Sequence, residues 1–181
     1  MLEAYDYIRD GTLTRKGELC ARVNGYEIAA TEAFENGWIG RCDPVQLTML
    51  FAAMIYEPRR FDDSAPPTRS LKGIAVPFTL HMESFASTEL AHRVGLPTRV
   101  PDFGVAGPVQ LWAEGVAFDR VLARTSLAPG DLVRLLRMTI QMLRQVEHSL
   151  TAEDPTRETL RAARDLIDRD VVDARRQLEL G

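Results

Sequence analysis

The sequence is poor in the residues that most often build catalytic or metal sites. It has only two cysteines, Cys20 and Cys42, which form no C-x-x-C pair, and its three histidines lie far apart. Two separate thiols are typical of a protein in a reducing compartment, and scattered histidines give little support to a metal site. The glycine-rich phosphate-binding motifs and the H-E-x-x-H zinc motif are also missing. The sequence therefore offers no recognisable catalytic apparatus.

Long apolar runs and an excess of positive charge are missing as well. No stretch approaches the roughly 20 apolar residues that span a bilayer, and the first residues lack the pattern of a signal peptide. We therefore expect a cytoplasmic protein without a membrane partner. Twenty-two lysines and arginines against 26 acidic residues give a net charge of −4 over 181 residues. This balance excludes a protein that coats nucleic acid through net charge, although not one with a local basic stripe.

Helical periodicity runs through almost the whole sequence, whereas strand patterns are nearly absent. This predicts an all-α bundle of six to eight helices. Asp43-Pro44 and Asp154-Pro155 each combine a favoured N-cap with a first-turn proline. Proline-rich residues 58–77 are expected to form an internal loop. Within residues 2–14 we expect a short helix and then a turn at Asp10-Gly11 that leads into Leu13-Thr14. The eight helices expected after it cover residues 15–23, 26–35, 44–57, 78–93, 105–114, 118–124, 129–150 and 155–178.

The helix expected over 129–150 has two distinct faces. One is apolar, and the other carries a polar stripe. A solvated helix face is one interpretation of this stripe. The other is a contact with single-stranded nucleic acid, because guanidinium groups reach phosphates and amides reach bases. The stripe consists of Arg134, Arg137, Gln141, Arg144, Gln145 and His148.

An ordered series of short motifs resembles a known family. The series comprises Leu13-Thr14-Arg15-Lys16-Gly17, Glu27, Glu32, Asn36-Gly37-Trp38-Ile39, Asp43-Pro44, Trp112-Ala113-Glu114-Gly115, Phe118, Gly130-Asp131-Leu132-Val133-Arg134 and Arg169-Asp170-Val171-Val172. In this order and at these intervals, the motifs resemble the C-terminal helical (DSHCT) domain of superkiller-type DExH-box RNA helicases. The resemblance covers about residues 13–178, and residues 1–17 resemble the tail of the winged-helix module that precedes this domain.

The resemblance implies an accessory role rather than a catalytic one. In the family, the helical domain packs against two RecA-like motor lobes and helps to enclose the threaded RNA strand. ATP and Mg²⁺ would bind those lobes, and no cofactor is expected for residues 18–181 themselves. The absence of motor motifs leads us to expect a fragment of a helicase. A free-standing protein-interaction module derived from such a helicase is the alternative.

The resemblance also suggests candidate RNA contacts. Glu57 falls where family members carry a glutamate that contacts an RNA base, although an exposed helix-end glutamate would look the same. Arg134 matches a family arginine, either as a strand contact or in a buried ion pair. Arg137 matches the next basic position. Met138 replaces the second basic residue of many relatives, so Arg137 or Arg144 is expected to take over that contact.

Other motif residues are expected to be structural. Trp112 has a large apolar body and one N–H to satisfy, which indicates a core anchor, with Phe118 following nearby. Gly115 is expected to end the helix before it. Gly130 suggests either that another segment approaches the backbone closely or that the chain turns tightly into the helix. Asp131 suits the positive end of a helix.

Overall fold

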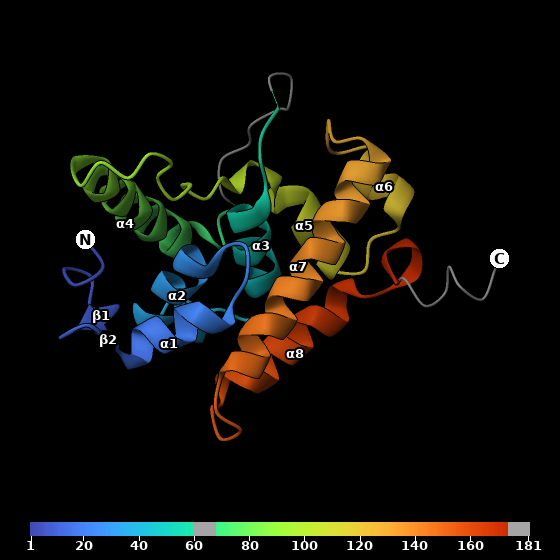
Figure 1. Ribbon diagram of the computed structural model, residues 1–181. Helices are drawn as coiled ribbons and strands as arrows, with labels where there is room; N and C mark the ends of the chain where they lie inside the picture. Colours follow the sequence, from blue (N-terminus) through green and yellow to red (C-terminus); the bar gives the residue numbers. More distant parts are fainter. Residues whose placement is uncertain (60–67, 174–181) are drawn as a thin grey trace.

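A computed structural model describes residues 1–59 and 68–173, and eight α-helices make up most of them. The central helix is α3 (Pro44–Ile55), which contacts α5 (Ala106–Ala113), α7 (Pro129–Ser149) and α8 (Thr156–Ile167). Figure 1 shows α7 and α8 side by side along one flank of the molecule, with α4 on the opposite flank. The predicted all-α bundle is confirmed.

The remaining elements surround this centre. They are α1 (Arg15–Arg22), α2 (Glu27–Glu35), α4 (Lys72–Ala91), α6 (Phe118–Leu122) and the short 3-10 helices η1 (Ile39–Arg41), η2 (Phe103–Val105) and η3 (Asp170–Val172). All residues of α3 from Leu47 to Ile55 are buried. Its predicted start is confirmed, because the Asp43 carboxylate accepts from the Gln46 N–H and the Gln46 side chain accepts from the Asp43 N–H.

The helix expected over residues 2–14 is wrong, because part of this segment forms a β-hairpin. Strands β1 (Ile8–Arg9) and β2 (Thr12–Leu13) pair antiparallel. Asp10 and Gly11 connect them with φ angles of 51° and 76°. Two successive left-handed residues form the turn that suits a tight hairpin, and Asp-Gly is a preferred sequence for it. The local turn chemistry therefore overrides the helical pattern.

Gly17 allows the hairpin to lie directly against α1. A Cβ atom at this position would stand 2.1 Å from the Tyr7 carbonyl oxygen, so only glycine fits without a shift of the backbone. The Thr14 side chain accepts from the Gly17 N–H and starts α1. The hairpin is thus packed on the helical body, and its relation to a preceding winged-helix module stays a prediction.

Two further boundaries differ from expectation. Helix α4 begins at Lys72, within the range 58–77 expected to be a loop, and includes the exposed Pro77 near its start. The last helix ends at Ile167 rather than near residue 178, and Asp170 then turns the chain with a φ of 49°. Residues 174–178, the end of the range expected for this helix, lie outside the described residues.

A buried carboxylate ties the hairpin, α1, α2 and α4 together. Glu32 on α2 is 1% exposed, and it accepts from Tyr7 Oη at 2.6 Å and from Asn36 Nδ2 at 3.3 Å. Its carboxylate also lies 2.5 Å from Lys16 Nζ and 2.8 Å from His81 Nε2. Lys16 Nζ in turn stands 4.5 Å from the centroid of the Tyr7 ring. We call these five residues the Glu32 joint.

A second buried carboxylate joins α7 to α8. Glu147 accepts from Arg161 at 2.8 Å and from Arg164 at 3.2 Å, and Arg157 lies 3.9 Å away. Three arginines of this arginine-rich chain thereby serve the packing of two helices. In the described residues, no helix combines the length and the apolar character that crossing a membrane requires.

Candidate nucleic-acid interface

The polar stripe lies on α7, which begins with Pro129 in its first turn. The buried face of this helix consists of Leu132, Leu135, Leu136, Thr139, Ile140, Met142, Leu143 and Val146. On the other face, Arg134, Gln141, Arg144 and His148 are exposed, whereas Arg137 and Met138 are half-buried. The predicted amphipathic pattern is confirmed, because the polar face of α7 with its arginines lies at the surface.

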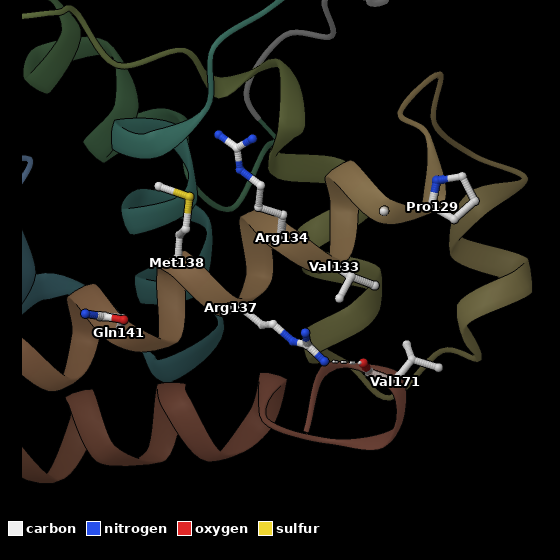
Figure 2. A pocket seen from close by; sticks show the side chains of 8 residues that line it. Pro129, Val133, Arg134, Arg137, Met138, Gln141 and Val171 are labelled. Atoms are coloured by element: carbon white, nitrogen blue, oxygen red, sulfur yellow. Dashed lines mark hydrogen bonds between the residues drawn. The ribbon is translucent and has the colours of Figure 1, made fainter. Parts of the chain in front are cut away.

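Three adjoining hollows lie along the polar face of α7. The first lies between α7 and the end of α3, and its lining includes Tyr26, Glu57 and Arg134. The second faces α7 near Val171 (Figure 2), and the third continues from Arg137 and Gln141 to Arg144. Neighbouring hollows share residues: Arg134 and Met138 line the first two, and Arg137 and Gln141 the last two. Together they form one surface feature, which we call the α7 groove.

The structure brings all four candidate contact residues to this groove. Glu57 lies in the first hollow, Arg134 between the first and second, Arg137 between the second and third, and Arg144 in the third. Residues from positions 57 to 144 thus meet on one face. The third hollow also contains the carboxylates of Asp168 and Asp173.

Among the described residues that line the groove, Arg134 and Arg144 are the two cations without a hydrogen-bond or ion-pair partner. Both are exposed, and neither forms a hydrogen bond or an ion pair with another of the described residues. A buried ion pair for Arg134, one of its two interpretations, therefore does not occur in the described part of the chain. A guanidinium without a protein partner keeps all its donors for a ligand such as phosphate.

Arg137 differs from these two arginines, because the protein itself engages its side chain. Its Nε donates to the Val172 carbonyl at 3.0 Å and its Nη2 donates to the Val171 carbonyl at 3.2 Å. Figure 2 shows Arg137 reaching toward Val171, whereas the Arg134 side chain points away from Val171. Arg137 thus fastens η3 to α7, and any strand contact would have to share its donors with that task.

Glu57 lies one residue beyond the C-cap of α3, and its side chain is 72% exposed. It forms an ion pair with Arg99, from the segment between α4 and η2. Arg99 also donates to the carbonyls of Met54 and Ile55 and lies over the Tyr26 ring. The sequence contains no periodic signal for Arg99, because it belongs to an irregular segment 42 positions away from its partner.

The structural motif residues lie behind and beside the groove. Trp112 is fully buried, packs edge-on against Phe118 and donates its indole N–H to the Ile167 carbonyl at 3.0 Å. Gly115 follows the end of α5 with a φ of 90°. The guanidinium of Arg169 stacks 3.5 Å from the Trp112 ring centroid and donates to the Trp112 and Val116 carbonyls. Burial lowers the pKa of Arg169.

Gly130 and Asp131 have simpler roles at the start of α7. No described side chain or distant backbone atom lies within 4 Å of a Cβ built on Gly130, so a close approach does not require glycine there. Asp131 lies in the first turn of α7, where its charge suits the helix dipole. Its two carboxylate oxygens each lie 2.9 Å from Arg59, which links α7 to the chain after α3.

Neither the two thiols nor any cluster of potential metal ligands provides a reactive centre in the described residues. Burial raises the pKa of Cys20, and it raises that of Cys42 to about 12, so neither thiol is an activated nucleophile. Within residues 1–59 and 68–173, no three His, Cys, Asp or Glu side chains gather into a potential metal site. The α7 groove instead combines arginine side chains, apolar surface and the carboxylates of Glu57, Asp131, Asp168 and Asp173. The described residues thus form a mostly helical domain with an arginine-lined groove along α7.

Comparison with known proteins identifies the family. The model of the DSHCT (NUC185) domain matches residues 10–174, and the chain therefore belongs to this family. The chain is 28% identical to "Probable helicase HelY" of Mycobacterium leprae over 89% of its own length and 19% of that protein. It is 22% identical to "Antiviral helicase SKI2" of Saccharomyces cerevisiae, over 87% and 13%.

A plant relative matches a shorter part of the chain. The Arabidopsis thaliana "DExH-box ATP-dependent RNA helicase DExH15 chloroplastic" is 32% identical over 43% of the chain and 7% of its own length. The chain thus spans less than a fifth of each of these helicases. The resemblance inferred from the ordered motifs is confirmed, as a helical domain that occurs in helicases of the superkiller type.

Proposed function

We propose that this domain is a non-catalytic accessory part of an ATP-dependent RNA helicase, and that its α7 groove contacts the threaded single-stranded RNA. The proposal rests on one observation above all: Glu57, Arg134 and Arg144 lie along a single groove, and both arginines are free within the described residues. Free cations beside a channel are what a phosphate backbone requires.

The dimensions and lining of the groove suit a flexible polyanion. Arg134 and Arg144 are ten residues apart on α7, which places them about 15 Å apart along the helix axis. This separation covers a few nucleotides of an extended strand. Val133, Met138 and Val171 add apolar surface between the cations, against which base faces can pack. A net charge of −4 keeps such binding weak and local to the groove.

The same proposal assigns ATP hydrolysis to other parts of the helicase. We propose that RecA-like motor lobes in cis pack against this domain and bind ATP and Mg²⁺, while the domain itself helps to enclose the strand. The support is that the relatives are named helicases and are more than five times longer than the matched region. A cytoplasmic location is part of this proposal.

Charge reversal in the groove tests the RNA contact. The double variant Arg134→Glu/Arg144→Glu should bind a fluorescently labelled single-stranded RNA at least about tenfold more weakly, because two attractive contacts become repulsive. Fluorescence anisotropy at two salt concentrations measures the affinity and its salt dependence. The matched control is Arg120→Glu/Arg124→Glu, which makes the same charge change at two exposed residues that line none of the three hollows.

Equal weakening by both double variants would show that only net charge matters and would contradict a role for the groove. A wild-type chain that binds no single strand would favour the alternative, a free-standing protein-interaction module. ATP turnover above background by the chain alone would contradict the non-catalytic assignment.

A further inference from the structure

Arg99 is held in place from both sides along the chain. The preceding residue, Thr98, donates its N–H and its hydroxyl to the buried carboxylate of Glu89 on α4. Three residues after Arg99, the Asp102 N–H donates to the Ala53 carbonyl of α3 at 2.9 Å. The segment that carries Arg99 is therefore fixed against two helices, although it has no regular structure of its own.

The Arg99 guanidinium itself has several partners at the end of α3. Its Nη2 lies 3.2 Å from the Ile55 carbonyl and 3.4 Å from the Met54 carbonyl, and its centre is 5.7 Å from the Tyr26 ring centroid. Carbonyls of a last helical turn lack intrahelical partners and attract cations. These contacts fix the orientation of the guanidinium before Glu57 is considered.

Glu57 has no such support of its own. Its side chain is largely exposed, and among the described residues Arg99 is the one ion-pair partner recorded for it. An exposed ion pair between two mobile side chains contributes little order. Because Arg99 is anchored on carbonyls and a ring, this pair instead gives the carboxylate a defined direction at the edge of the first hollow.

We infer that Arg99 is a positioning residue for Glu57: it neutralises the carboxylate inside a groove for an anionic strand and aims its free oxygen at the base edge. This inference rests on the proposed function, because it assumes that a single strand occupies the α7 groove. One carboxylate oxygen faces Nη1 of Arg99, and the other can accept a hydrogen bond. A base must therefore present an N–H donor at this point.

The donor requirement makes the inference testable with two oligonucleotides. Uridine has a single base-edge donor, the N3–H, and 3-methyluridine lacks it. The wild-type chain should bind an oligouridine about three- to tenfold more tightly than its N3-methylated counterpart, the range of one net hydrogen bond. Anisotropy titrations at low salt measure both affinities. The readout is the ratio of the two affinities, because a loss of charge alone weakens both strands equally.

Arg99→Gln and Glu57→Ala should each reduce this ratio to about one. Arg99→Lys keeps the charge but cannot serve two carbonyls, a ring and a carboxylate at once, so most of the discrimination should be lost with it as well. The matched control is Arg41→Gln, which removes one exposed charge on η1, away from the groove. It should weaken both strands alike and keep the wild-type ratio.

Several outcomes would overturn the inference. If Arg99→Gln still prefers oligouridine over its N3-methylated counterpart, or if Arg99→Lys keeps the full preference, Glu57 needs no fixed guanidinium. If Glu57→Ala keeps the preference, another residue is responsible for it. If the wild type shows no preference, Glu57 does not contact a base N–H. Thermal unfolding of each variant identifies any that is not folded, and Glu57→Ala, at an exposed position, covers that case.

The same experiment separates this inference from the proposed function. If the wild-type chain binds neither oligonucleotide, or binds them independently of Arg134 and Arg144, both the proposed function and the role of Arg99 are contradicted. If it binds through those arginines but Arg99→Gln still prefers the unmethylated oligouridine, only the role of Arg99 is contradicted.

Discussion

The Glu32 joint and the α7 groove are both rich in charge, but they use it in opposite ways. In the joint, a carboxylate that is 1% exposed has polar partners from the hairpin segment, α1, α2 and α4. In the groove, Arg134 and Arg144 are exposed and have no partner among the described residues. Buried charges with a full set of partners hold a fold together, whereas exposed charges without partners remain available to a ligand.

Removal of the carboxylate from the joint should have the largest effect. Glu32→Gln leaves Lys16, whose side chain is only 14% exposed, without its counter-ion. Breaking a buried ion pair from one side costs about 3–5 kcal/mol of unfolding free energy. Urea denaturation measures this loss. The matched control is Glu35→Gln on the exposed side of the same helix, which should change stability by less than about 0.5 kcal/mol.

The pH dependence of the unfolding free energy distinguishes the contribution of the Glu32 charge from that of its packing. Burial opposes ionisation of Glu32, but hydrogen bonds from Lys16, Tyr7 and His81 outweigh it and hold its pKa below the usual value. A lowered pKa stabilises the fold above the unfolded-state value of about 4.3, and this contribution is lost as the pH falls through the folded-state value. The stability difference between wild type and Glu32→Gln should therefore narrow only below about pH 4. A difference that stays constant down to pH 3 would contradict the ionic role.

Arg137 is intermediate between the two regions and should have an intermediate effect. It lies in the groove, yet it donates two hydrogen bonds to the carbonyls of η3. Arg137→Gln should cost about 1–3 kcal/mol of unfolding free energy, because the Val171 and Val172 carbonyls lose their charged donor. Urea denaturation of this variant and of Arg144→Gln provides the comparison. Equal stabilities of the two variants would show that the contacts with η3 contribute nothing.

The two regions also differ in how much the sequence predicts. The polar stripe of α7 was predictable, because each turn repeats apolar and polar positions that tertiary contacts do not override. Glu57 was found only through the family resemblance. The Glu32 joint was not predictable, because it joins positions 7, 16, 32, 36 and 81 from separate elements.

Irregular segments account for most of the remaining differences. Arg99 lies in a segment without periodicity, and its position follows from the Glu89 and Ala53 contacts rather than from local sequence. The turn at Asp10-Gly11 was predictable, but the two strands that flank it were not, because they have only two residues each, too few to show alternation.

The smallest effect on stability is expected in the groove itself. Arg134→Gln/Arg144→Gln should change the free energy of unfolding by less than about 0.5 kcal/mol, because neither side chain has a partner to lose among the described residues and glutamine keeps similar helix propensity. Urea denaturation measures this directly, with Arg120→Gln/Arg124→Gln as the control for net charge. A loss above 1 kcal/mol would show that these arginines serve the fold. No change in the free energy of unfolding, together with weaker RNA binding, would show that these arginines serve ligand binding and not the stability of the fold.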